Sequence, residues 1–403
     1  MDSIDVLVVG GGSAGLSVSH ELASVGIDHV VLERGRIGQA WRDRWDSFCL
    51  VTPNWSVRLP GGAYAGEDPD GFMPRDEIVA HLERYAVTSR APIREGVDVR
   101  TIDRVSAGFV ARTSTGDLHA ARVILCTGAF QRAYRPAGAD TLPAGLVQLD
   151  IEDFRNERSL PAGPVLIVGS GQSGCQLAEE LREAGRDVVL SCGKAPWAPR
   201  RLGDRDLIWW IEASGFLDQP VASLPSPAAR LSANPVATGH GGGHDLNLRT
   251  LRAMGVTLAG HFLGATGNQA QFAPDLAESI AWGDARNREL MSLIVRAADD
   301  RALPRPAIAD PAPFDGRAPE EISLDGFGAV VFAGGFRPDF RSWLPWADAF
   351  DEMGFPIQLD GASLVVDGLF FVGTHFLRNR KSSTLLGVGV DAAIVARTIA
   401  GQR

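Results

Sequence analysis

The sequence lacks the cysteine pattern of several common site types. Its 403 residues contain four cysteines, Cys49, Cys126, Cys175 and Cys192, and no two of them form a CxxC pair. That spacing disfavours a metal cluster and a redox dithiol, and scattered thiols fit a reducing compartment. We therefore expect no metal ion and a cytoplasmic location.

Long apolar runs and an excess of positive charge are also missing. No apolar run approaches the ~20 residues of a membrane-spanning helix, and no basic segment precedes the apolar residues that start at Ile4. We therefore expect neither a membrane anchor nor a signal peptide. The net charge of −10 disfavours nucleic acid and anionic membranes as partners, because both attract a positive surface. We therefore expect a small-molecule partner.

Glycine is abundant, and part of it falls in a recognisable pattern near the start of the chain. Residues 6–33, "VLVVGGGSAGLSVSHELASVGIDHVVLE", predict a strand, a glycine-rich turn, a helix and a second strand. The turn contains Gly10, Gly12 and Gly15 in a GxGxxG spacing. These glycines permit a tight turn and let a pyrophosphate approach the N-terminus of the helix. The unit therefore predicts a dinucleotide site.

The end of this unit supports the same interpretation. Glu33 lies 18 residues after Gly15, where the second predicted strand ends. A carboxylate at that place can accept a hydrogen bond from a ribose hydroxyl. We expect Ser13 and Ala14 within the loop, and Arg34 after the strand, to line the same site.

A second GxGxxG unit follows at residues 165–194, "VLIVGSGQSGCQLAEELREAGRDVVLSCGK". It has the same order of strand, turn, helix and strand, so it predicts a second dinucleotide site. The expected site residues are Gly169, Ser170, Gly171, Gln172, Ser173 and Gly174.

The second unit differs from the first where its last strand ends. Cys192 stands in the place of the acid, so no carboxylate is there to repel a 2′-phosphate. Ser191 can donate a hydrogen bond, and Lys194 and Arg200 carry positive charge. This end favours NADPH over NADH as the second nucleotide.

Two dinucleotide sites in one chain suggest that hydride passes from NADPH to a flavin. We assign FAD to the first site. The predicted fold is α/β, with two Rossmann-like domains and the NADPH domain inserted in the FAD domain. Residues 1–150 and 310–403 would form the FAD domain, and residues 151–309 the NADPH domain, with Pro-rich segments near both boundaries.

Several further segments, taken together, resemble the bacterial flavin-containing monooxygenases, which are class B flavoprotein monooxygenases. They are "IGQAWRDRWDSFCLVTPNWSVRLPGG", "VILCTGAF", "PRRLGDRDLIWWIEASG", "VVFAGGFRPDF" and "LRNRKSSTLLGVGVDAA". The resemblance implies FAD, NADPH and O2, with one oxygen atom transferred from a flavin C4a-hydroperoxide. The implied substrate is a small molecule containing nitrogen or sulfur, or a ketone. A homodimer is compatible with the sequence, which leaves the oligomeric state open.

The resemblance also assigns residues. Asn54 falls near the place of an active-site asparagine, although a structural role in a Pro-Asn turn is an equal alternative. The segment that wraps along the flavin would contribute Trp41, Arg42 and Trp45, and the linker motif that usually contains Ala-Thr-Gly would correspond to Cys126, Thr127 and Gly128.

One position departs from the family pattern. Asp150 stands where many members have a histidine, and Phe154 follows in the aromatic position. This departure argues against a typical Baeyer–Villiger enzyme and makes Asp150 a candidate catalytic residue. It also keeps an alternative open, an NADPH oxidase or flavoprotein reductase of the same architecture without a stable oxygenating intermediate.

Three weaker patterns have two interpretations each. His240 and His244 flank three glycines, which suggests either a metal site or a glycine-rich loop. Trp197 could line a substrate channel or pack in a core. His375 could approach the flavin or serve as a loop residue.

Overall fold

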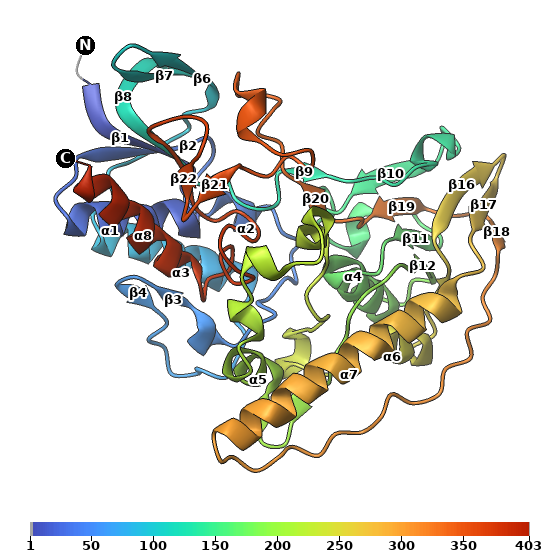
Figure 1. Ribbon diagram of the computed structural model, residues 1–403. Helices are drawn as coiled ribbons and strands as arrows, with labels where there is room; N and C mark the ends of the chain where they lie inside the picture. The colour runs from blue at the N-terminus through green and yellow to red at the C-terminus, as the bar shows by residue number, and fades with distance from the viewer. Residues whose placement is uncertain (1–2, 403) are drawn as a thin grey trace.

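The computed structural model describes residues 3–402 and contains two lobes, each built around a parallel sheet (Figure 1). The first lobe combines the N-terminal and C-terminal parts of the chain, and the middle of the chain forms the second. The expected α/β class with two glycine-loop units is confirmed.

The first sheet has a parallel centre in the order β23-β8-β1-β2-β5. Helices α1, α3 and α8 lie together on one side of it in Figure 1, and Phe109 and Phe340 pack on the other. Burial on both faces explains the apolar runs of β1 and β2. The bounds are β1 Ser3–Val9, β2 His29–Glu33, β5 Ile93–Glu95, β8 Gly116–Leu125, β23 Leu369–Phe371, α1 Ser13–Ser24, α3 Arg75–Thr88 and α8 Val388–Gly401.

The second sheet is entirely parallel, in the order β10-β19-β11-β12-β15. Helix α4 packs on one face of it, and Phe262 and Phe272 pack on the other. The long helix α7, predicted over 276–300, is present with those bounds. The bounds are β10 Val147–Asp150, β11 Val165–Val168, β12 Val188–Ser191, β15 Thr257–Ala259, β19 Ala329–Phe332, α4 Gln172–Glu183 and α7 Leu276–Asp300.

The expected domain boundaries need a correction. Strands β10 and β19 belong to the second sheet, where β19 pairs with β11 and β10 pairs with β19, although both lie outside the 151–309 segment. The Pro-rich segment 304–321 does not return the chain to the first lobe, because β18 (Glu321–Ser323) and β19 after it still pair within the second. The lobes are joined at β9 (Arg132–Ala133) and β20 (Phe336–Arg337), which pair antiparallel.

Smaller elements complete the two lobes. Strands β6 and β7 form an antiparallel meander with β8, and β16, β17 and β18 form a three-stranded sheet in the second lobe. The bounds are α2 Gln39–Arg42, β3 Arg58–Leu59, β4 Gly62–Ala63, β6 Val99–Val105, β7 Gly108–Thr113, β13 Arg201–Leu202, β14 Arg205–Asp206, α5 Leu207–Ala213, α6 Leu248–Ala253, β16 Phe262–Thr266, β17 Gln269–Phe272, β21 Gln358–Leu359 and β22 Ala362–Ser363.

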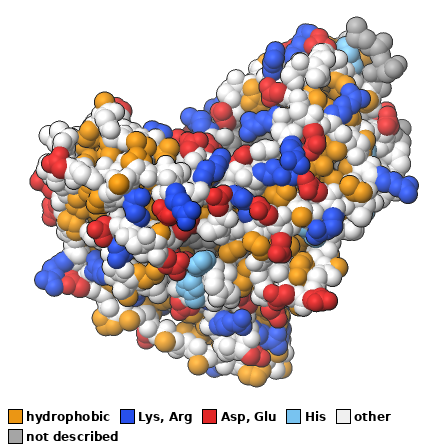
Figure 2. All heavy atoms as spheres, turned by 180° about the vertical axis from the view of Figure 1, so that it is seen from behind, with side chains coloured by type: hydrophobic (Ala, Val, Ile, Leu, Met, Phe, Trp, Pro, Cys, Tyr) orange, Lys and Arg blue, Asp and Glu red, His pale blue; other side chains and the backbone are white. Residues whose placement is uncertain are grey.

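The surface carries charges of both signs. Figure 2 shows blue and red side chains interspersed over this face of the molecule, with no broad area of one sign. Among the helices of residues 3–402, none combines the length and apolar character that crossing a membrane requires.

Candidate cofactor-binding site

The first glycine loop joins β1 to α1, and two of its glycines are required by close packing. Gly10 has φ of +109°, and a Cβ there would lie 2.5 Å from the Cys126 carbonyl oxygen. A Cβ at Gly15 would lie 1.9 Å from the Gly10 carbonyl oxygen. Any side chain at these two positions would therefore collide with backbone.

The middle glycine of this loop is different, because it faces open space. A Cβ at Gly12 would have no heavy atom within 4 Å. Helix α1 begins directly after it, with no side-chain cap and no acidic residue in the first turn. Its first N–H groups, on Ser13 and Ala14 among others, can therefore receive an anion. The loop fits a pyrophosphate on the side where Gly12 leaves room.

Glu33 ends β2 beside this loop, as expected, and is 8% exposed. One carboxylate oxygen accepts from the Gly11 N–H at 2.7 Å, and the other accepts from the Gly35 N–H at 2.8 Å. Charge-assisted bonds of this kind hold the carboxylate in one position. Glu33 therefore fixes the shape of the loop at the edge where a ribose would lie, and Arg34 after it is exposed.

The linker motif lies against the same loop. Cys126 is buried, its N–H donates to the Val9 carbonyl, and burial raises the pKa of its thiol. Gly128 has φ of +81° and open space at its Cβ position. The Gln131 amide donates to the Thr127 hydroxyl at 2.9 Å and to the Gly128 carbonyl at 3.0 Å. These two hydrogen bonds fix the conformation of the turn.

The second loop repeats these features between β11 and α4. Gly169 has φ of +116°, and its Cβ would lie 2.6 Å from the Ala333 carbonyl oxygen. A Cβ at Gly174 would lie 1.9 Å from the Gly169 carbonyl oxygen, while Gly171 faces open space. Helix α4 also begins without a side-chain cap or an acidic residue in its first turn. The second loop therefore offers the same anion cradle.

Polar side chains of the second loop hold its surroundings. The Ser170 hydroxyl accepts from the Gly193 N–H at 3.0 Å. The Gln172 amide pairs with the backbone of Ala237, accepting from its N–H at 3.0 Å and donating to its carbonyl. Ser173, in the first turn of α4, is half-buried.

Two residues expected to contact a 2′-phosphate are committed elsewhere. Ser191 is 3% exposed, and its hydroxyl donates to the Gly260 carbonyl at 2.9 Å, because the strand is buried on both faces. Arg200 is 2% exposed and forms an ion pair with Asp206 at 2.7 Å. Its guanidinium also donates to the Val51 carbonyl, so it joins the second lobe to the first. Both expectations are corrected.

Lys194 is the third residue expected to contact the 2′-phosphate. His261, which lies beside the same strand end, was not identified from the sequence. Lys194 is exposed just beyond β12. The imidazole Nε2 of His261 lies 3.0 Å from the position of a Cβ on Gly193. Its Nδ1 pairs with Asp275 at 2.5 Å. Only the pairing of β12 with β15 brings His261 there, so no local pattern could have found it.

The Trp-rich segment connects the lobes. Trp45 is 3% exposed and packs edge-on against Phe48, so it is a core residue. Trp41 is half-buried with its ring centroid 5.9 Å from that of Phe48. Arg42 pairs with Glu83 of α3. Trp45 and Arg42 thus have structural roles, and Trp41, which is half-buried, is the residue of the three with surface left for a ligand.

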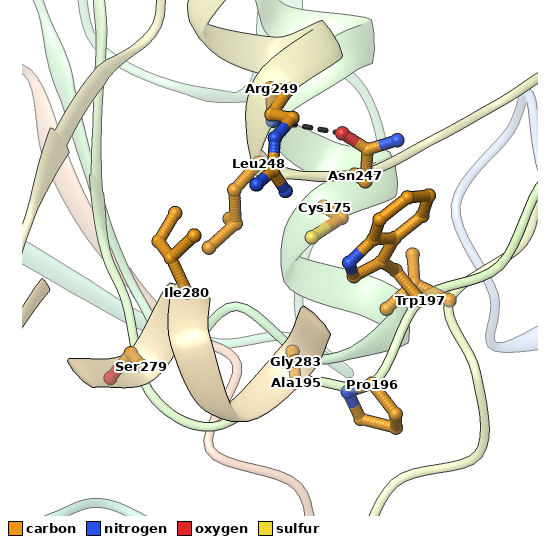
Figure 3. Close-up of a pocket in the computed structure, with 11 residues that line it drawn as sticks. Cys175, Ala195, Pro196, Trp197, Asn247, Leu248, Arg249, Ser279, Ile280 and Gly283 are labelled. Carbon is orange, nitrogen blue, oxygen red and sulfur yellow. Dashed lines mark hydrogen bonds between the residues drawn. The ribbon is translucent and has the colours of Figure 1, made fainter. Parts of the chain in front are cut away.

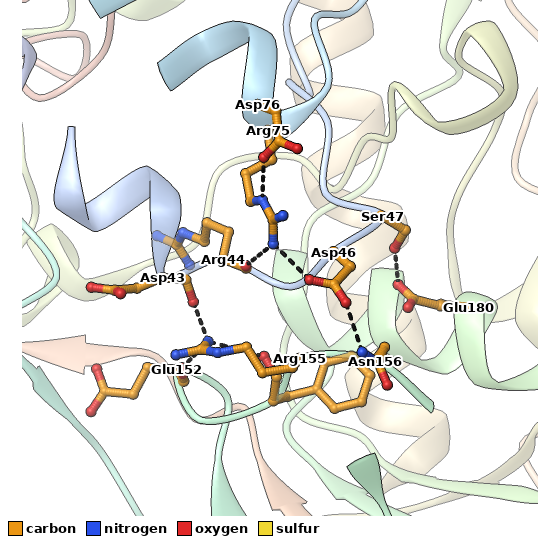
Figure 4. Close-up of polar contacts among 11 residues, drawn as sticks. Asp43, Arg44, Asp46, Ser47, Arg75, Asp76, Glu152, Arg155, Asn156 and Glu180 are labelled. Carbon is orange, nitrogen blue, oxygen red and sulfur yellow. Dashed lines mark hydrogen bonds and ion pairs between the residues drawn. The ribbon is translucent and has the colours of Figure 1, made fainter. Parts of the chain in front are cut away.

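Polar contacts tie this segment to the second lobe, as Figure 4 shows. The Asp46 carboxylate accepts from Asn156 at 2.7 Å and from Arg75 at 2.8 Å. The hydrogen bond from Asn156, followed by that from Arg75, lowers the pKa of Asp46. Ser47 donates to Glu180 of α4 at 2.5 Å. The segment is therefore fixed against both lobes.

The two expected catalytic residues have structural partners. Asn54 is 3% exposed, its amide donates to the Asp68 carbonyl at 2.9 Å, and its amide oxygen accepts from the Met73 N–H at 2.7 Å. This geometry favours the structural alternative for Asn54. Asp150 receives two hydrogen bonds from Arg135, at 2.8 and 3.0 Å. It holds the linker after β9 against the end of β10.

The other weak candidates also find ordinary roles. Trp197 lines a cavity of about 20 Å³ beside Cys175, shown in Figure 3, which has room for about one water molecule. Its indole donates to Asp284 at 3.0 Å. His240 pairs with Glu183 and His244 with Glu179, and no group of three metal-ligating side chains occurs within residues 3–402.

His375 lies at the same edge of the first sheet as the first glycine loop. It follows β23, and a Cβ at nearby Gly373 would lie 2.6 Å from that of Ala14. The His375 ring packs edge-on against Phe130 at 5.4 Å, and its Nδ1 is 3.0 Å from the Ser383 hydroxyl. Burial, with a smaller contribution from Arg380, lowers the pKa of His375 to about 4. The imidazole is therefore neutral at physiological pH.

Both glycine loops open toward the same junction. The turn after β8 leads within a few residues to β9, and the turn after β19 leads to β20. Because β9 and β20 pair, the carboxyl ends of both sheets meet at this two-stranded ribbon. Ligands of parallel α/β sheets bind at those ends. Two nucleotides bound at the loops would approach each other there.

Residues 7–213, from β1 to the end of α5, match the family described as pyridine nucleotide-disulphide oxidoreductase. The chain belongs to this family. It is accordingly an oxidoreductase. The four cysteines are free and buried, so none pairs as a redox disulfide in the described structure.

Relatives cover the whole chain. An uncharacterized CzcO-like oxidoreductase of Geobacillus kaustophilus is 29% identical over 402 residues, 98% of each chain. The CzcO oxidoreductase of Bacillus subtilis is 26% identical over 400 residues, 99% of each chain.

Solved structures share the fold. A mutant flavin monooxygenase from Stenotrophomonas maltophilia has a TM-score of 0.71 at 21% identity, covering 100% of this chain and 99% of that one. The expected resemblance to bacterial flavin-containing monooxygenases is thus confirmed for the fold. An ornithine N-hydroxylase from Kutzneria, with a TM-score of 0.65 at 14% identity over both whole chains, was solved with reduced FAD and NADP⁺.

Proposed function

We propose that this protein is an FAD- and NADPH-dependent monooxygenase. It would insert one oxygen atom from O2 into a small substrate that contains nitrogen or sulfur, or into a ketone. The observation that carries the proposal is the pair of equivalent anion cradles, at Gly12 and Gly171, whose sheets end at one ribbon. One nucleotide supplies hydride and the other accepts it.

We assign FAD to the first loop and NADPH to the second. The Glu33 carboxylate, held by two backbone N–H groups, suits the ribose of FAD. At the second loop, Lys194 and His261 follow the ends of β12 and β15 and would offer donors to a ribose phosphate, while Asp275 is already paired with His261. This charge distribution supports NADPH rather than NADH.

The protein's own residues would hold and shield the reacting groups. The first N–H groups of α1 and α4 would bind the two pyrophosphates. Segment 41–48, fixed by Asp46 and Ser47 to the second lobe, would cover the junction between the nucleotides and limit water. Bound FAD would supply the oxygen-activating chemistry, with a flavin C4a-hydroperoxide as the oxygen donor.

The relatives' names support oxygenation of nitrogen, sulfur or carbonyl compounds. They include an ornithine N-hydroxylase, an S-allyl-L-cysteine S-oxygenase from Allium sativum and an indole-3-pyruvate monooxygenase from rice. We extend that chemistry, rather than any one substrate, to this chain.

Anaerobic reduction by NADPH followed by mixing with O2 tests the proposal. A monooxygenase should form a lasting flavin spectrum distinct from the oxidised and reduced forms, and should oxygenate members of a panel of amines, sulfides and ketones. Direct return to oxidised flavin with one H2O2 per NADPH, across the whole panel, would instead identify the oxidase alternative.

A further inference from the structure

Arg380 is a half-buried arginine at the junction of the two lobes, and no acidic side chain among residues 3–402 pairs with it. Among residues 3–402, the guanidinium of Arg380 donates only to neutral amides, those of Asn234 at 3.1 Å and Gln219 at 3.0 Å. Its buried Nε has no hydrogen-bond partner. Burial lowers the pKa of Arg380 to about 10, so the group remains charged at physiological pH.

The neighbouring cations make a useful contrast. Arg378 pairs with Asp391 at 2.7 Å, and Lys381 pairs with Asp218 at 2.5 Å. Each of them has a carboxylate, whereas Arg380 between them has none. Withdrawing a charge from water without a counter-charge is costly, so an anionic ligand would stabilise the half-buried Arg380.

The surroundings of Arg380 suit an organic ligand. Its guanidinium lies 4.4 Å from the centre of the Phe216 ring and 4.9 Å from that of Phe376. Segment 378–381 is bound to the second lobe, since Val221 donates to the Arg378 carbonyl and Lys381 donates to the Leu217 carbonyl. Arg380 therefore stands where the lobes meet, with aromatic surfaces beside a cationic donor.

The position of Arg380 relative to the first loop is also defined. It follows His375 by five residues, and its charge contributes to the lowered pKa of that imidazole. His375 packs on Phe130, which lies two residues beyond Gly128 of the linker motif. Arg380 is thus at the same edge of the first sheet as the proposed flavin site.

We propose that Arg380 binds the carboxylate of the substrate, so that the oxygenated molecule is a small organic acid. This inference rests on the proposed function, and it adds the substrate class. Arginine binds carboxylates with two parallel hydrogen bonds, and the buried Nε of Arg380 is a donor that no group among residues 3–402 accepts from. The aromatic rings would contact the apolar part of the acid.

Equilibrium binding to the oxidised FAD holoenzyme tests the proposal without requiring oxygen transfer. The probes are 4-(methylthio)benzoate and 4-(methylthio)benzamide, which differ in charge and little in shape, and the readout is the change in the flavin spectrum. We expect at least a tenfold lower Kd for the benzoate. Arg380→Gln should abolish this preference, and Arg380→Lys should retain part of it.

Arg230→Gln is the matched control, because Arg230 also stacks on a ring, that of Phe355, but pairs with Asp351. It should leave the preference unchanged. Equal affinity of the wild type for both probes, or a preference that survives Arg380→Gln, would overturn the proposal.

A separate titration with NADPH identifies the other anion that could fill the site. If Arg380→Gln weakens NADPH binding tenfold and leaves the benzoate preference intact, the partner is a cofactor phosphate and the proposal is wrong. If the protein proves to be an oxidase, the monooxygenase assignment fails while acid binding at Arg380 is still measurable. The two failures are therefore distinguishable.

Discussion

The two glycine loops use the same backbone devices and end differently. In each, the first glycine has a positive φ beneath a carbonyl of the neighbouring strand, the third touches the first, and the middle one faces open space. The strand after the first loop ends in Glu33, held by two N–H groups, and the strand after the second continues into buried Cys192. The shared part binds a pyrophosphate, and the part that differs selects the nucleotide.

We expect the largest effect on stability from substitutions at the third glycine of each loop. Gly15→Ala and Gly174→Ala would each place a Cβ 1.9 Å from a backbone oxygen, so the free energy of unfolding should fall by about 3 kcal/mol or more. Gly12→Ala and Gly171→Ala should change it by less than about 1 kcal/mol. Urea unfolding of the four variants measures this difference. Equal losses at all four positions would refute the distinction between the third and the middle glycine, and losses that differ between the loops would refute their equivalence.

The next effect separates the two strand ends. Glu33→Gln would place an amide nitrogen against the Gly11 or Gly35 N–H, and losing a charged, buried hydrogen-bond partner costs about 1.5–3 kcal/mol. We expect the variant to lose FAD on gel filtration. Cys192→Ala should retain FAD in full. Loss of FAD from both variants would show that the two strand ends do not differ in their effect on FAD binding.

A smaller effect concerns coenzyme choice. Lys194→Ala should lower the ratio of kcat/KM for NADPH to that for NADH by about tenfold, the value of one charged hydrogen bond to phosphate. Arg200→Gln should leave that ratio unchanged while lowering thermal stability, because Asp206 loses its buried partner. A changed ratio in Arg200→Gln with an unchanged one in Lys194→Ala would reverse our assignment.

The smallest effect compares ionisable groups at the two sheet edges. Asp150 at the second edge is paired with Arg135, whereas His375 at the first is buried and neutral, with its pKa lowered to about 4. Below pH 6.5 the His375 imidazole binds a proton in the unfolded chain but not in the folded chain. The free energy of unfolding should therefore fall as the pH drops from 6.5 toward 4. We expect a loss of about 1 kcal/mol by pH 5.5 from this group, absent in His375→Gln, by urea unfolding at each pH.

The sequence predicts local units well and long-range placement poorly. The strand, turn and helix around each loop follow from periodicity and glycine spacing within about thirty residues. Strands β10 and β19 were missed as members of the second sheet because the pairing of β19 with β11 and of β10 with β19 joins distant segments. Arg200 lies only eight residues beyond Cys192, yet the chain turns it toward Val51 of the other lobe.

The candidate site shows the same division. The glycines and Glu33 could be identified because their chemistry depends on adjacent backbone. Ser191 was assigned from its residue type and place, and Asn54 from the family resemblance with a structural role as an equal alternative. In the structure both side chains form hydrogen bonds with backbone groups of other segments. His261 reaches the end of β12, and Arg380 reaches the junction of the lobes, only through tertiary contacts, so no spacing rule indicates them.

Reduction of two middle-glycine variants by NADPH tests the central claim most directly. Gly12→Val and Gly171→Val place side chains in the two cradles, where a Cβ has no heavy atom within 4 Å, and Gly145→Val is a control at an equally open glycine outside both loops. We predict that Gly171→Val binds FAD normally and is reduced by dithionite but not by NADPH, while Gly12→Val lacks FAD. Rapid NADPH reduction of Gly171→Val, or full FAD in Gly12→Val, would contradict the assignment of the two sites.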